Sequence, residues 1–287
     1  MRIASADGVE LALHDLGGSA GSPPLLLSHA TGFHAFVFAP LAACLAPRFH
    51  CWGLDHRGHG ESGVPTTDIG DWGRFGDDAR SAADALGLVG SLGFGHSMGG
   101  TALLMAELDR PGTFAGLVLF EPIAFPHDPR TEVPEREGPA LMVAAARRRR
   151  AVFASRDDAY DNYAGKPPLA LFAPEALRGY VEHGFVDRAD GTVELTCDPE
   201  HEARIFEGGR RQDTFDRLGE IGCPVLVMAG SPEGNAPGLI APVVAEALPL
   251  GRLTVLDGLT HFGPMQDPAA VAGHILAFAD EVDASTG

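Results

Sequence analysis

Four glycines surround a single serine in the stretch GFGHSMGG, residues 93–100. The preceding residues from 88 are mostly apolar, as in a buried strand, and the segment MGGTALLMAEL that follows is typical of a helix. Glycine tolerates positive φ and close backbone approach, but each one costs conformational entropy on folding. Their concentration here predicts a tight strand-to-helix turn that raises Ser97 above the edge of a sheet.

The rest of the chain repeats this alternation of short apolar runs with longer helical patterns. Further strands are expected at 24–30, 49–55, 114–122, 223–230 and 251–258, and helices at 37–47, 71–87 and 268–282. Strands that alternate with helices favour a mostly parallel sheet with helices packed against it. We therefore predict an α/β fold with a mostly parallel central sheet flanked by helices.

The pattern changes between Pro122 and Gly222, where charge increases and all three tyrosines occur. We interpret residues 126–213 as a helical cap inserted into a core formed by 1–125 and 214–287. Insertions of this kind often become lids over a site at the sheet edge. The four arginines at 147–150 fan around a helix, which favours a solvated, ion-paired face and leaves an anion-binding role as the alternative.

Composition excludes several classes of function. The formal net charge of −18 disfavours nucleic acid and anionic membranes as partners. No apolar run approaches the ~20 residues of a membrane helix, and without the apolar segment of a signal peptide a cytoplasmic protein is expected. Cysteines 44, 51, 197 and 223 lack paired spacing, so neither a metal site nor a disulfide framework is indicated, and we expect no cofactor. Oligomeric state is not indicated.

Gly95, Ser97 and Gly99 form the pattern G-x-S-x-G between an expected strand and an expected helix. This context identifies Ser97 as a candidate nucleophile. A serine hydroxyl needs a positioned base near neutral pH. His261 follows the last expected strand and precedes the last helix, so it should lie at the same sheet edge, after the serine in chain order as this class of triad requires.

Two further segments, LLLSHATGF (25–33) and LDHRGHGES (54–62), complete a resemblance to the α/β-hydrolase fold family, in its lid-bearing, lipase- and esterase-like serine hydrolase branch. The resemblance covers most of the chain outside the insertion. It implies an oxyanion hole made by the backbone N–H groups of Thr31 and Met98. Ala30 stands where glycine is usual, but both donors belong to the main chain.

The same resemblance leaves two positions for the acid that orients the histidine. Glu233 follows the seventh core strand, the usual place, and Glu121 ends the sixth. We favour Glu121, because a carboxylate at the end of a buried strand is costly unless something pairs with it.

These residues favour a cofactor-free serine hydrolase that cleaves a small-molecule carboxylic ester or thioester. A carbon–carbon hydrolase, a lactonase or a biosynthetic cyclase would use the same residues, and a small-molecule binding or signalling protein with weak catalysis is the alternative from another class. We expect the substrate pocket to be lined by the aromatic side chains of the loops and the cap: His29, Phe33, Phe125, Phe153, Tyr163 and Phe172.

Overall fold

The computed structural model describes residues 1–287 except 20, 128–137, 233–235 and 287. Its main sheet has eight strands in the order β1-β2-β4-β3-β5-β6-β10-β11. The two N-terminal strands run antiparallel to their neighbours, and the other six are parallel. The strands are β1 (Arg2–Ala4), β2 (Glu10–Gly17), β3 (Pro24–Ser28), β4 (His50–Asp55), β5 (Ser91–His96), β6 (Phe114–Phe120), β10 (Val225–Gly230) and β11 (Gly251–Leu256).

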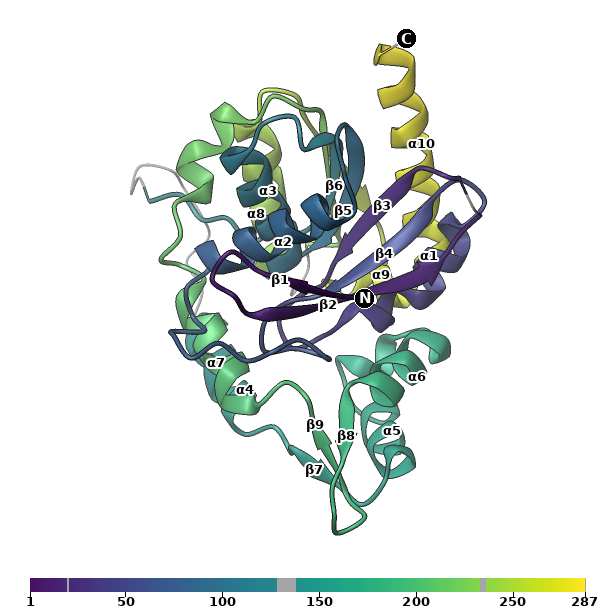
Figure 1. The fold of residues 1–287 in the computed structure, drawn as a ribbon, viewed down its shortest axis with the longest axis vertical. Coiled ribbons are helices and arrows are strands. Elements are labelled where there is room, and N and C mark those ends of the chain that lie inside the picture. Colours follow the sequence, from purple (N-terminus) through teal and green to yellow (C-terminus); the bar gives the residue numbers. More distant parts are fainter. Residues whose placement is uncertain (20, 128–137, 233–235, 287) are drawn as a thin grey trace.

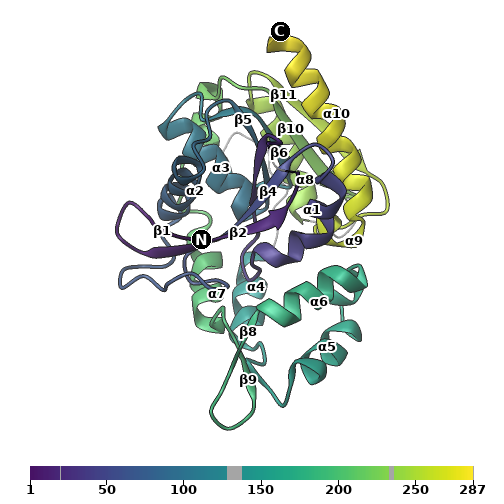
Figure 2. The same cartoon turned by 45° about the vertical axis from the view of Figure 1, so that its right-hand side comes forward.

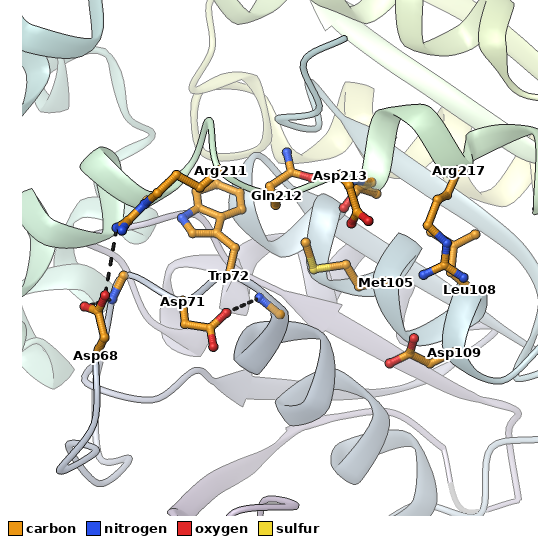
Figure 3. Close-up of a pocket in the computed structure, with 14 residues that line it drawn as sticks. Asp68, Asp71, Trp72, Met105, Leu108, Asp109, Arg211, Gln212, Asp213 and Arg217 are labelled. Atoms are coloured by element: carbon orange, nitrogen blue, oxygen red, sulfur yellow. Dashed lines mark hydrogen bonds and ion pairs between the residues drawn. The ribbon is translucent and has the colours of Figure 1, made fainter. Parts of the chain in front are cut away.

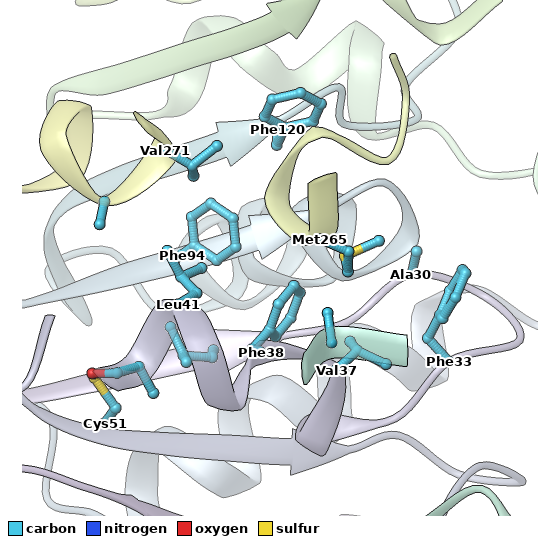
Figure 4. Close-up of a cluster of buried hydrophobic side chains, with 14 of the residues drawn as sticks. Ala30, Phe33, Val37, Phe38, Leu41, Cys51, Phe94, Phe120, Met265 and Val271 are labelled. Carbon is cyan, nitrogen blue, oxygen red and sulfur yellow. The ribbon is translucent and has the colours of Figure 1, made fainter. Parts of the chain in front are cut away.

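Helices cover both faces of this sheet (Figures 1 and 2). One apolar cluster packs α2 (Gly73–Ala85), α3 (Met98–Asp109) and α8 (Ala236–Ala247) against one face. A second cluster packs α1 (Ala39–Leu45), α9 (Gly263–Gln266) and α10 (Pro268–Thr286) against the other, and it includes Phe38, Phe94 and Phe120 (Figure 4). The expected α/β class with a mostly parallel sheet is confirmed.

A smaller group of elements lies beyond one end of the sheet in both views (Figures 1 and 2). It contains helices and a three-stranded antiparallel sheet of order β7-β9-β8, so this region is less purely helical than its sequence suggests. Its elements are α4 (Gly138–Arg147), β7 (Val152–Phe153), α5 (Arg156–Ala164), α6 (Pro174–His183), β8 (Phe185–Asp187), β9 (Val193–Leu195) and α7 (Pro199–Gly208).

Short 3-10 turns complete the chain: η1 (Ala35–Phe38), η2 (Leu169–Leu171) and η3 (Thr214–Glu220). In the described part of the chain, no helix is both long and apolar enough to cross a membrane.

Candidate active site

Ser97 occupies the sharp turn between β5 and α3. Its φ of 54° lies in a region that L-residues rarely adopt. A Cβ added to Gly95 would meet the Gly100 Cα at 2.5 Å, and one added to Gly99 would meet the Ser28 carbonyl oxygen at 2.2 Å. The glycines are therefore needed because backbone passes against backbone on both sides of the serine. The turn is further held by Ser97 N–H, which donates to the Phe120 carbonyl at 2.9 Å.

Glu121 directly follows β6, the neighbour of β5, and it is fully buried. Its Oε2 lies 2.6 Å from His261 Nδ1, and its Oε1 accepts a hydrogen bond from Gly230 N–H at 2.8 Å. Glu121 also has a positive φ of 47°, and it shares this property with Ser97 alone among the described non-glycine residues. Strained backbone of this kind clusters at functional sites, where the surrounding structure holds it in place.

His261 lies in the loop between β11 and α9, at the edge where the parallel strands end. The Nδ1–H that faces Glu121 leaves Nε2 as the ring's proton acceptor. His96 Nε2–H donates to the His261 carbonyl oxygen at 2.7 Å. Burial lowers the pKa of His96 well below its ordinary value, so the His96 ring is neutral and acts here as a fixed donor.

The structure therefore brings Glu121 and His261 together, and Glu233 lies outside the described residues. Sequence reasoning named both glutamates and favoured Glu121. The signal that favoured Glu121 was its position at the end of a buried strand.

Thr31 and Met98, the expected oxyanion donors, lie close together. The Thr31 hydroxyl donates to the Met98 sulfur at 3.3 Å. Neither backbone N–H has an acceptor within the described part of the chain. Met98 is also the first residue of α3, where unpaired N–H groups and the helix dipole favour negative charge.

Buried histidines hold the loop that carries Thr31. Gly32 N–H donates to His59 Nε2 at 3.0 Å, and His59 Nδ1–H donates to the Arg57 carbonyl. His29 Nδ1–H donates to the Ala30 carbonyl at 2.8 Å, and its Nε2 accepts from His56 N–H. The His29 and His59 rings each use one nitrogen as donor and the other as acceptor, which only neutral imidazole can do. Burial lowers the pKa of His59 to about 4 and that of His56 to about 3.

A cavity of about 370 Å³ opens above Ser97 and His261, between the sheet edge and the smaller group of elements. Phe33 and Phe262 lie on the core side, and Tyr163 and Leu169 lie on the opposite side. The remaining wall residues are Ala30, Thr31, Gly32, Met142, Ala145, Ala146, Arg149, Asn162, Lys166, Pro167, Pro168, Tyr180, Glu202 and Phe206.

Of the six side chains expected to line the pocket, Phe33 and Tyr163 do so. The other four are absent from its wall, which corrects the expectation. His29 is fully buried under the loop that it holds, and Phe172 packs behind Phe33 with ring centroids 5.8 Å apart. Phe153 is buried in the core of the smaller region, and Phe125 lies under the Arg210 guanidinium. These aromatic residues are used for packing, which the residue type alone does not reveal.

A second hollow of about 630 Å³ lies between α2, α3 and the chain after α7 (Figure 3). Asp68, Asp71, Asp109 and Arg217 border it. None of the described candidate catalytic residues borders it, so the larger of the two hollows is not the candidate active site. No group of three or more histidine, cysteine, aspartate or glutamate side chains among the described residues could hold a metal ion.

Comparisons with known proteins identify the family of this fold. A model of the alpha/beta hydrolase family matches residues 25–274. A protein of Agrobacterium fabrum with the name "Putative carbamate hydrolase RutD" is 28% identical over 266 residues, which cover 90% of this chain and 94% of the relative. The crystal structure of E-2-(acetamidomethylene)succinate hydrolase has a TM-score of 0.81 at 22% identity and covers 98% of both chains. The enol-lactonase of Burkholderia xenovorans LB400 gives a TM-score of 0.72 at 19% identity and covers 98% of this chain and all of its own.

Proposed function

Because the chain belongs to the alpha/beta hydrolase family, we propose that it is a serine hydrolase that cleaves a carboxylic ester or thioester through an acyl-enzyme. One observation carries the proposal: the 2.6 Å contact between Glu121 Oε2 and His261 Nδ1, beside a cavity whose wall also contains Ser97. Carboxylate, imidazole and hydroxyl then have the roles of orienting group, base and nucleophile.

In the proposed reaction, His261 Nε2 accepts the proton of the Ser97 hydroxyl as its oxygen attacks the carbonyl carbon. The imidazolium that forms is stabilised by the buried Glu121 carboxylate, which also fixes the tautomer. When the tetrahedral intermediate collapses, the same proton passes to the leaving alkoxide or thiolate. Water, activated by His261 in the same way, then hydrolyses the acyl-enzyme and releases the acid.

We assign the oxyanion to the backbone N–H groups of Thr31 and Met98. Two observations support this assignment: both N–H groups lack an acceptor in the described residues, and Met98 begins a helix. Loss of one such donor costs about 3 kcal/mol of transition-state stabilisation in other enzymes. His59 and His29 are positioning residues in this scheme, because they hold Gly32 and Ala30 on either side of Thr31.

We further propose that residues 126–213 act as a cap. Its support is that α4, α5, α6 and α7 each contribute at least one residue to the cavity wall opposite Ser97. A cavity of about 370 Å³ suits a small-molecule substrate.

Carbamate cleavage is the second candidate. The observation that favours it is the named carbamate hydrolase that matches 90% of the chain at 28% identity. A carbamate carbonyl is attacked by the same nucleophile and yields the same kind of tetrahedral intermediate, so the candidate site needs no additional group.

Steady-state hydrolysis of p-nitrophenyl acetate, an acetyl thioester and p-nitrophenyl N-methylcarbamate tests the proposal and separates its two forms. Ser97→Ala should lower kcat by a factor of about 10³ or more, because no other group replaces the nucleophile. Ser81→Ala is the matched control, since that hydroxyl donates to the Asp77 carbonyl of its own helix and is absent from the cavity wall. Turnover by Ser97→Ala within tenfold of the wild type would contradict the nucleophile assignment.

A further inference from the structure

Arg149 differs from the arginines beside it in the run at 147–150. Arg147 pairs with Glu200 and Glu207, and Arg150 pairs with Asp158, and both side chains are about half exposed. The Arg149 side chain is only 20% exposed and belongs to the wall of the active-site cavity. Of these three arginines, Arg149 is therefore the one that a bound substrate would contact.

Two buried partners fix the Arg149 guanidinium. Its Nη1 donates to Glu202 Oε2 at 2.5 Å, and its Nη2 donates to the Tyr180 hydroxyl at 2.5 Å. Glu202 is 7% exposed and Tyr180 is 2% exposed, so neither partner is free to move into solvent. A guanidinium has five N–H donors, and these contacts use two of them. The remaining donors form a rigid fork that suits the two oxygens of a carboxylate.

The guanidinium lies next to the loop that carries Thr31. A Cβ added to Gly32 would come 3.3 Å from Arg149 Nη1 and 2.4 Å from Glu202 Oε1. A group bound to Arg149 therefore lies only a short chain away from the carbonyl that occupies the proposed oxyanion hole.

The charges on the cavity wall favour an anion. Among the described wall residues, Arg149 and Lys166 are the cations and Glu202 is the single carboxylate. Lys166 Nζ donates to the neutral Asn162 Oδ1 at 2.6 Å. The described part of the wall thus has one more positive than negative charge, although the protein as a whole has a net charge of −18. The Arg149 side chain is only 20% exposed, so its charge is screened less than that of Lys166, which is exposed to solvent.

We propose that the substrate carries a carboxylate a few carbon atoms from the scissile carbonyl, and that Arg149 binds this carboxylate while Lys166 contributes to the anionic selectivity. This inference rests on the proposed hydrolase function and specifies its substrate class: a short half-ester or half-thioester of a dicarboxylic acid. Glu202 and Tyr180 are positioning residues, since they hold the guanidinium by one N–H on each of its two Nη atoms and leave its other N–H groups available to a ligand.

The test compares two esters with the same carbon skeleton, ethyl hydrogen glutarate and ethyl pentanoate, by pH-stat titration. The wild type should prefer the acidic ester by at least tenfold in kcat/KM. Arg149→Gln should reduce this ratio to near one, mainly by raising KM for the acidic ester. Arg147→Gln is the matched control and should leave the ratio unchanged. Lys166→Met should lower the ratio by a factor of two to five.

Arg149→Gln leaves Glu202 buried without its partner, which can impair folding. The double variant Arg149→Gln/Glu202→Gln removes both charges and should show the same loss of preference. Arg149→Lys keeps the charge and loses the fork, so its preference should be intermediate.

Calorimetry with glutarate itself separates failure of this inference from failure of the hydrolase function. Binding of glutarate to the wild type and its loss in Arg149→Gln would support the carboxylate site even if no ester were hydrolysed. Hydrolysis of both esters at equal rates, or glutarate binding that is unchanged by Arg149→Gln, would overturn the inference and leave the hydrolase function intact.

Discussion

The sheet edge and the wall opposite it position their parts of the site in different ways. At the sheet edge, backbone dictates position: Ser97 and Glu121 follow adjacent parallel strands, and both have a positive φ. On the opposite wall, side-chain packing dictates position, as with Arg149, which depends on Glu202 from α7 and Tyr180 from α6. The difference suggests that changes at the sheet edge affect the chemical step and the fold, whereas changes on the opposite wall affect the choice of substrate.

We expect the largest loss of activity in this comparison from Glu121→Gln at the sheet edge. The substitution keeps the volume but loses the charge that stabilises the His261 imidazolium, so kcat should fall by a factor of about 10³–10⁴. KM should change little, because Glu121 is absent from the cavity wall. Steady-state kinetics with p-nitrophenyl acetate measures both constants. Glu233→Gln is the matched control, and a larger loss there than in Glu121→Gln would reverse the assignment of the acid.

A second substitution tests whether backbone contact, rather than side-chain packing, determines the position of Ser97. In Gly99→Ala the new methyl group would lie 2.2 Å from the Ser28 carbonyl oxygen, so the turn must move. Overpacking of this kind typically costs about 1–3 kcal/mol of unfolding free energy, and here kcat should fall with it. Urea denaturation followed by circular dichroism measures the stability.

Gly273→Ala provides the opposite control, because a Cβ at Gly273 in α10 meets no atom within 4 Å. Alanine in a helix interior should stabilise the protein by about 0.5–1 kcal/mol and leave kcat unchanged. Equal stability of Gly99→Ala and the wild type would show that the turn does not need glycine there.

A more gradual effect is expected from pH. Burial depresses the pKa of His56 to about 3 and that of His59 to about 4, below the ordinary value near 6.5. The unfolded chain therefore binds protons that the folded chain excludes, and stability is full above pH 6.5 and is lost as pH falls toward 4. Each such histidine should contribute a slope of up to about 1.4 kcal/mol per pH unit.

Urea midpoints between pH 8 and pH 4.5 measure this loss. His59→Gln should flatten the profile, because glutamine cannot take up the proton. A wild-type stability that does not change over this pH range would contradict the lowered pKa values of His56 and His59.

Sequence reasoning located the residues at the sheet edge because their positions follow from the order of strands. The end of a parallel strand, a glycine-rich turn and the order of serine before histidine are all visible in the sequence, and they point to Ser97 and His261. The choice between Glu121 and Glu233 was not visible in the same way, because both follow strands of the same sheet.

The opposite wall could not be derived from sequence. Phe153 and Tyr163 lie in the same region and have similar side chains, yet the first is buried in packing and the second lines the cavity. Likewise, which arginine of the run faces the cavity depends on where α4 ends and on carboxylates about 50 residues later in the chain. Long-range packing decides both, and a local pattern does not encode it.

The central claim is that Ser97 is an activated nucleophile, and reaction with a fluorophosphonate probe tests it most directly. Mass spectrometry after digestion should locate one phosphonyl adduct on the peptide that contains Ser97. The adduct should be absent in Ser97→Ala and should form much more slowly in Glu121→Gln, because the probe needs the same base as the substrate. A wild-type protein that stays unlabelled, or that carries the adduct on another residue, would contradict the claim and favour a binding protein built on the same fold.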